Sequence, residues 1–192
     1  MNRKRPLTSL LLCAVLIAFA PSCSFMYRIT APDGHEKKLI EDTTRQAQAH
    51  LTLGEYQKAL ELYAGHYDKY HYSEMRAPYA GTAEQVRNAA DAAYQKKDFA
   101  DAGNIYKTLY ESGITAGDFA PSLSFDDEYL NRQMKACAKG LLEAGLTKYR
   151  EGKLEDAISV WKKALVFDQD SKDIKSAIDT ATTQLLNLKN LK

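Results

Sequence analysis

Cysteine and histidine are two residue types in this 192-residue chain whose side chains could attack a substrate or bind a metal ion. Cys137 could act as a nucleophile only if a nearby base lowered its pKa, and Lys135 and Lys139 are close to it in sequence. At helical spacing it is flanked by Met134 and Leu141, which favours a buried thiol that packs as a small apolar side chain. We therefore expect no catalytic role for Cys137.

The histidines are poorly placed to bind a metal ion. His35, His50, His66 and His71 all precede residue 82. His66 and His71 are five residues apart, so on a helix they point about 140° apart and cannot bind one ion together. The sequence also contains no glycine-rich phosphate loop, HExxH or Gly-x-Ser-x-Gly motif. We expect no metal, no cofactor and no enzymatic activity.

The elements that must position any functional residue are helices, because helical periodicity runs almost throughout residues 35–192 and no long segment alternates with period two. We expect helices over about 36–53, 55–72, 82–96, 98–111, 126–150, 153–167 and 171–188. Thr82 to Gln85 has the form of a capping box, and Asp98 and Ser124 are the other predicted N-caps. Residues 113–124 are predicted to form a loop.

Three ten-residue blocks repeat along the chain, beginning at Gly54, Lys97 and Gly152. Each contains a large apolar residue, an alanine three positions later and an aromatic residue four positions after that. The three sets are Tyr56, Ala59 and Tyr63; Phe99, Ala102 and Tyr106; and Leu154, Ala157 and Trp161. These positions share one helix face, and the alanine allows a neighbouring helix to approach closely.

These blocks resemble the second helix of the tetratricopeptide repeat (TPR) family, in which antiparallel helix pairs stack. The third copy matches best, at Leu141, Ala144, Gly145, Tyr149, Gly152, Leu154, Ala157, Trp161 and Ala164. Ala59 and Ala102 are 43 residues apart and Ala102 and Ala157 are 55 apart, whereas the family repeat is about 34 residues. The resemblance, over roughly residues 40–170, implies an all-α, short and interrupted superhelix with a C-terminal capping helix, with insertions near 73–81 and 113–124.

The resemblance also implies where a partner binds. In this family the first helix of each pair lines a groove that binds a peptide or a helix of a partner. Alignment to the third copy gives five candidate partner-binding residues: Arg87, Tyr94, Lys139, Tyr149 and Arg150. The last predicted helix carries Ile174, Ile178, Ala181, Leu185 and Leu188, and it either caps the array or supplies a seam for self-association or for a partner.

Residues 1–22 have the pattern of a secretory signal peptide. A basic start, Arg3 to Arg5, precedes an uncharged run over residues 7–20. As a helix this run would span about 21 Å, which is short of the roughly 30 Å hydrocarbon core of a bilayer. We therefore expect export of the chain rather than a permanent membrane-spanning anchor.

The residues before Cys23 resemble the end of a bacterial lipoprotein signal, in which a small residue precedes the cysteine that becomes the lipidated N-terminus. Ser22 and Cys23 match that ending, whereas Ala20 and Pro21 differ from the residues usual upstream. With Cys23 acylated, Cys137 would be the only free thiol of the processed chain, so no intrachain disulfide could form. Acylation would also explain the presence of Cys23. Ordinary cleavage and secretion is the alternative.

The lipoprotein resemblance implies a chain anchored in the cell envelope and facing the periplasm. Lipidated Cys23 would hold it in the membrane, and residues 23–34 would form a tether. Ser24 rather than aspartate after the cysteine favours the outer membrane.

The overall charge of the chain argues against nucleic acid as a partner. The chain has 26 basic and 25 acidic residues, and three of the basic ones fall within residues 1–22. The processed chain is therefore slightly acidic, whereas nucleic-acid binders depend on an excess of basic residues. We expect a non-enzymatic scaffold or adaptor that binds another envelope protein or a peptide segment; the alternative is a permanent structural subunit of an outer-membrane, pilus or secretion complex.

Overall fold

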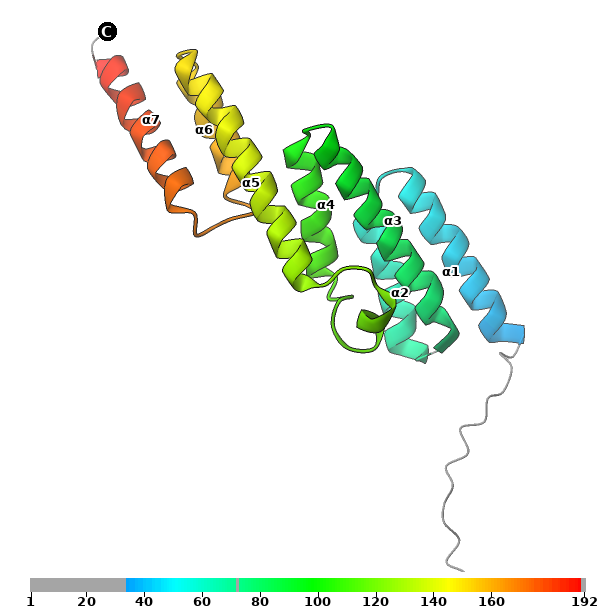
Figure 1. The fold of residues 1–192 in the computed structure, drawn as a ribbon. Helices are drawn as coiled ribbons and strands as arrows, with labels where there is room; N and C mark the ends of the chain where they lie inside the picture. Colours follow the sequence, from blue (N-terminus) through cyan, green and yellow to red (C-terminus); the bar gives the residue numbers. More distant parts are fainter. Residues whose placement is uncertain (1–33, 72, 191–192) are drawn as a thin grey trace, which may run out of the picture. The chain divides into compact units, whose positions relative to one another are not determined.

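The computed structural model describes residues 34–71 and 73–190, and in these residues it contains seven α-helices, two short 3-10 segments and no strand (Figure 1). The helices are α1 (Gly34–Thr52), α2 (Tyr56–Tyr70), α3 (Arg76–Gln95), α4 (Phe99–Glu111), α5 (Asp127–Arg150), α6 (Leu154–Ala164) and α7 (Lys172–Asn190). The 3-10 segments are η1 (Ser73–Met75) and η2 (Gly117–Ser122). The predicted all-α class is confirmed. The predicted signal peptide and Cys23 lie outside the described residues, as does the predicted tether except for Gly34.

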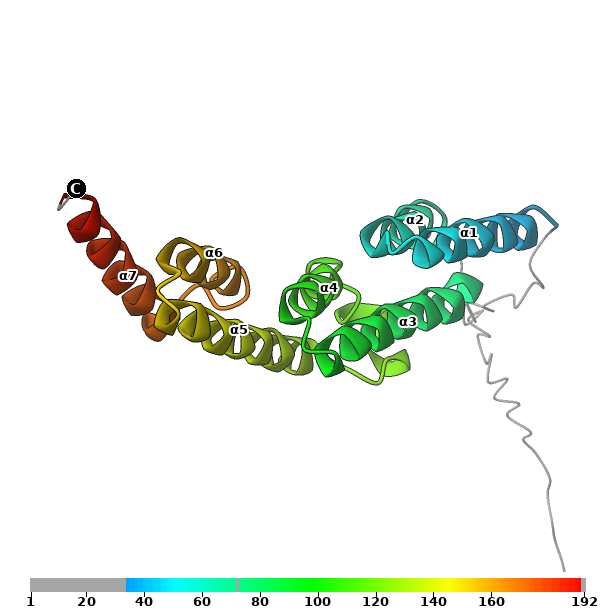
Figure 2. The same ribbon diagram turned by 90° about the horizontal axis from the view of Figure 1, so that it is seen from above.

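The helices pack as neighbouring pairs in a TPR-like arrangement. α1 packs on α2, α3 on α4 and α5 on α6, and each second helix runs antiparallel to the first (Figure 1). α4 and α6 both pack against α5 (Figure 2). α7 covers α6 with Ile174 and Ala181 buried, which confirms its role as a capping helix.

The turn inside each pair has the same backbone geometry, and it lies where the repeated block begins. Gly54, Lys97 and Gly152 adopt left-handed φ values of 73°, 63° and 75°. The amide after each of them donates to the carbonyl five residues earlier, over 2.9 to 3.0 Å. This is the Schellman motif, which satisfies the last carbonyls of a helix and normally places glycine at the left-handed position. Lys97 occupies that position without being a glycine.

The repeated alanine and aromatic positions form the core of each pair. Ala59, Ala102 and Ala157 are fully buried. The aromatic ring that follows each alanine is also buried and reaches back to the first helix of its own pair. The three contacts are Tyr63 Oη to Thr44 Oγ1, Tyr106 Oη to an oxygen of Asp91, and Trp161 Nε1 to the Leu142 carbonyl. The spacing read from the sequence thus gives both close packing and a partner for each polar ring atom.

Two glycines allow α5 to approach its neighbours closely. A Cβ atom built on Gly145 would lie 2.1 Å from Nε1 of Trp161 on α6, and one on Gly140 would lie 2.4 Å from the Phe99 ring on α4. No side chain fits at such distances without displacing the ring. The two aromatic residues therefore pack directly on the α5 backbone.

Two predicted caps are wrong. α3 begins at Arg76, so Thr82 is buried inside the helix and no capping box forms there. Pro78 falls in the first turn of α3, a place where proline is compatible with a helix. The N-cap of α5 is Asp126, whose carboxylate accepts from the amide of Tyr129 at 2.7 Å, rather than Ser124. The predicted cap Asp98 is confirmed, because it accepts from the Asp101 amide.

Candidate partner-binding surface

The five predicted partner-binding residues lie on the first helices of two pairs. Arg87 and Tyr94 are on α3, and Lys139, Tyr149 and Arg150 are on α5. Lys139 and Arg150 are exposed, whereas the other three are partly buried. The structure does not bring the five together in one pocket, and their binding role stays a prediction.

Arg87 is held by ion pairs within α3. Its guanidinium lies 3.0 Å from Glu84 and also contacts Asp91, and only 21% of its side chain is exposed. Asp91 in turn accepts hydrogen bonds from Tyr106 on α4 and from Tyr129 on α5, the second at 2.8 Å. We call Glu84, Arg87, Asp91, Tyr106 and Tyr129 the polar joint. Its bonds tie α3, α4 and α5 together.

Glu84 extends the polar joint to the segment before α5. Its carboxylate accepts from the Ser124 amide at 2.6 Å and from Ser124 Oγ at 2.9 Å. Burial alone would raise the pKa of Glu84, but the hydrogen bonds from Ser124 and Arg87 lower that pKa below its ordinary value. Burial and the bond to Asp91 raise the pKa values of Tyr106 and Tyr129. The joint therefore holds an ionised Glu84 beside two neutral tyrosines.

Tyr94 has a packing contact of its own. Its ring meets that of Phe99 edge to face, with centroids 5.4 Å apart. Phe99 is the ring that rests on Gly140 of α5. Tyr94 therefore supports the junction between the second and third helix pairs.

Tyr149 lines a hollow between α5 and α7, which we call the α5–α7 hollow. Its volume is about 290 Å³, and it is lined by Leu146, Tyr149, Trp161, Asp173, Ser176, Ala177 and Thr180. The Tyr149 ring lies 6.0 Å from that of Trp161. The lining combines apolar side chains with hydroxyl groups and one carboxylate, a composition that suits a peptide or a side chain of a partner.

Residues 113–124 fold back onto α2 and α3, which the sequence did not predict. The Phe119 ring lies between Tyr67 of α2 and Tyr79 of α3, with centroid distances of 4.7 and 4.9 Å. The Asp118 carboxylate accepts from Arg76 at 2.8 Å and from Tyr67 Oη at 3.0 Å. We call this segment the brace, because it joins α2 to α3. Tyr63, Tyr67 and Tyr70 share one helix face by their i, i+4, i+7 spacing, which indicates packing of that face but does not identify residues 113–124 as its partner.

Cys137 and two histidines serve in packing. Cys137 is buried, and burial raises its pKa to about 12, so its thiol is neutral at ordinary pH. His66 Nδ1 lies 2.7 Å from Thr43 Oγ1 and links α2 to α1. His50 Nδ1 lies 2.6 Å from Glu55 in the turn after α1. The predicted burial of Cys137 is confirmed.

Within residues 34–71 and 73–190, no group of three or more metal-ligating side chains could hold an ion. No helix in that same part of the chain has both the length and the apolar character needed to cross a membrane.

No protein-family model matches the chain, and no curated protein matches it significantly.

Proposed function

We propose that this chain is a non-enzymatic scaffold or adaptor of the cell envelope, which binds another envelope protein through its TPR-like helix pairs. The observation that carries the proposal is the α5–α7 hollow. It lies between α5, a first helix, and the capping helix, and it is open to a partner. Tyr149, a residue selected from the sequence, lines it.

Two exposed charged residues suit reversible recognition of a partner. Arg150 follows Tyr149 and is exposed, while Asp173 on α7 supplies a charge of the opposite sign. Tyrosine and arginine are enriched among residues that dominate binding energy at interfaces. Arg87 and Tyr94 are engaged in contacts within the fold, and through these contacts they position α3.

We further propose that Cys23 is acylated and anchors the chain to a membrane facing the periplasm, with the outer membrane favoured. Two or more acyl chains hold a protein stably on a bilayer. Replacing Cys23 with alanine should release the protein from the membrane fraction. A variant that stays equally bound would contradict acylation at Cys23, and a wild-type chain found in the medium would support ordinary secretion.

A permanent structural subunit is the second candidate, and exposed apolar side chains on α7 favour it. Leu186 and Leu188 are 56% and 50% exposed near the end of that helix. A permanent subunit would cover them in its complex, and without its partners it should aggregate or be degraded. An adaptor without its lipid should stay soluble as a monomer or dimer.

The experiment is in-cell crosslinking followed by purification of the full chain through a C-terminal tag. Wild type is compared with a Tyr149→Ala, Arg150→Ala variant and with a control in which the exposed Lys135 and Glu143 become alanine. Recovery of one dominant envelope protein from wild type and control, and its loss from the Tyr149 variant, is the expected result. Failure to recover any partner from wild type would overturn the scaffold proposal.

A further inference from the structure

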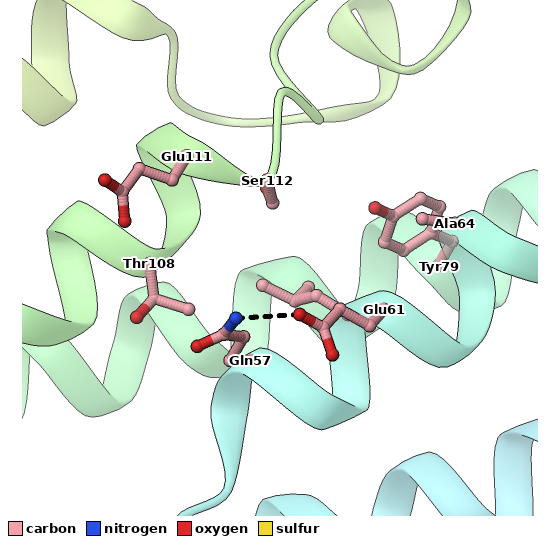
Figure 3. A pocket seen from close by; sticks show the side chains of 8 residues that line it. Gln57, Glu61, Ala64, Tyr79, Thr108, Glu111 and Ser112 are labelled. Carbon is pink, nitrogen blue, oxygen red and sulfur yellow. Dashed lines mark hydrogen bonds between the residues drawn. The ribbon is translucent and has the colours of Figure 1, made fainter.

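A second groove runs between α2 and α4, the second helices of the first two pairs. One part has a volume of about 220 Å³, and its walls carry Gln57 and Glu61 of α2 opposite Thr108, Glu111 and Ser112 of α4 (Figure 3). The adjoining part, of about 500 Å³, shares three of its lining residues: Gln57, Glu61 and Thr108. The two parts are adjacent, and together we call them the α2–α4 groove.

The floor of the α2–α4 groove is apolar. Leu60 and Tyr79 lie beneath the first part, and Ile105 lies beneath the second. All three are nearly buried and belong to the core. An aliphatic stem laid along this floor would keep apolar contact while its polar end reached the walls.

The walls of the groove are acidic. Glu55, Glu61, Asp101 and Glu111 line it, and Lys58 is the one basic residue among its lining residues. Lys58 pairs with Glu55, and Lys107, on α4 just outside the lining, pairs with Glu111. Among the described residues, Glu61 and Asp101 have no ion pair with a basic side chain; Glu61 accepts only a hydrogen bond from Gln57, at 2.7 Å.

We propose that the α2–α4 groove binds a basic, extended segment of a partner protein. Lysine or arginine side chains of that segment would lay their aliphatic stems on Leu60 and Tyr79 and direct their charges to Glu61 and Asp101. This inference rests on the proposed scaffold function and assigns the partner's chemistry. It places a second contact on the second helices of the first two pairs, apart from the α5–α7 hollow, with which the groove shares no lining residue.

The test measures binding of a short fluorescein-labelled peptide of alternating lysine and alanine to the full chain by fluorescence anisotropy. Wild type is compared with Glu61→Gln, Asp101→Asn. The matched control, Glu143→Gln, Asp179→Asn, loses the same charge from exposed positions on α5 and α7. Thermal unfolding confirms that both variants are folded.

We expect the groove variant to bind the peptide roughly three- to tenfold more weakly, because it loses two charge contacts at the solvent-exposed Glu61 and Asp101, and exposed charge pairs contribute only modestly to binding. The control should stay within about twofold of wild type. Peptide-induced NMR shifts should centre on the amides of Gln57, Glu61 and Thr108. Equal weakening in both variants, no weakening in either, or shifts centred elsewhere would overturn the groove.

The two proposals fail in different ways. Suppose that the peptide does not bind the groove, but crosslinking still recovers a partner whose recovery requires Tyr149. The groove proposal is then wrong and the scaffold proposal stands. If no partner is recovered from cells, the scaffold proposal fails whatever the peptide does.

Discussion

At several positions in this protein, backbone geometry restricts the residue type as strongly as burial does. The left-handed position of the turn is glycine in two helix pairs and Lys97 in the other. The positions that face Trp161 and Phe99 are glycines because a Cβ atom would overlap the rings. These residues therefore offer sharp tests of the structure.

Replacing Lys97 with glycine should stabilise the protein by roughly 0.5–1 kcal/mol, because a lysine at φ 63° bears a steric cost that glycine avoids. Gly152→Ala should destabilise it by about 1 kcal/mol or more for the converse reason. Urea unfolding at an unchanged m-value measures both. A destabilising Lys97→Gly would show that this turn is not left-handed.

Replacing Gly145 with alanine should destabilise the protein by about 1–3 kcal/mol, because the added methyl group would overlap the buried Trp161 ring. Gly65 supplies the control, since it lies in α2 with no atom within 4 Å of an added Cβ. Gly65→Ala should be neutral or stabilising by up to about 1 kcal/mol through helix propensity. Equal effects of the two changes on the urea midpoint would argue against close α5–α6 packing.

The pH dependence of protein stability tests whether Glu84 is ionised in the polar joint. Hydrogen bonds lower its pKa below the ordinary 4.5, so the stability that it contributes is present above pH 4.5 and is lost as the pH falls through the lowered pKa. Glu84→Gln should therefore lose stability at pH 7 and show a smaller further loss on acidification than wild type. Urea midpoints from pH 7 to pH 3 measure this, and parallel curves for the two proteins would rule out an ionised Glu84 in the joint.

The helices could be predicted from local sequence patterns, whereas contacts between residues far apart in the sequence could not. All seven predicted helices are present, because periodicity and the repeated blocks are local properties. The start of α3 was misplaced, because Pro78 and Gly81 mark a loop in many sequences but here lie within a helix. The polar joint and the brace could not be predicted, because each depends on residues more than 30 positions apart that meet only in the fold.

The brace should determine how firmly the first helix pair is held. Phe119→Ala removes the ring between Tyr67 and Tyr79, so amide hydrogen exchange should accelerate in α1 and α2 while α5 to α7 change little. Val166→Ala, at an exposed apolar residue, is the control and should leave α1 and α2 unchanged. Uniform acceleration across all helices would mean that the brace stabilises the whole fold rather than this junction.

At the level of the whole molecule, the sequence predicted the helices on which the five candidate residues lie, but not which of these side chains are engaged in contacts within the fold. Alignment selected Arg87 and Tyr149 by the same reasoning, yet Arg87 lies in ion pairs of the polar joint while Tyr149 lines a hollow. The difference arises because residues from α4 and α5 meet Asp91, the partner of Arg87, and nothing in one repeat specifies its neighbours.

Site-specific photocrosslinking in cells can show whether the chain binds a partner through the α5–α7 hollow. A photoreactive amino acid replaces Ser176, which lines the hollow, or Thr182, which is exposed elsewhere on α7. We predict one dominant crosslinked protein from position 176, little from position 182, and loss of the first product when Tyr149 is changed to alanine. Equal products from both positions, or none from position 176, would contradict partner binding through the α5–α7 hollow.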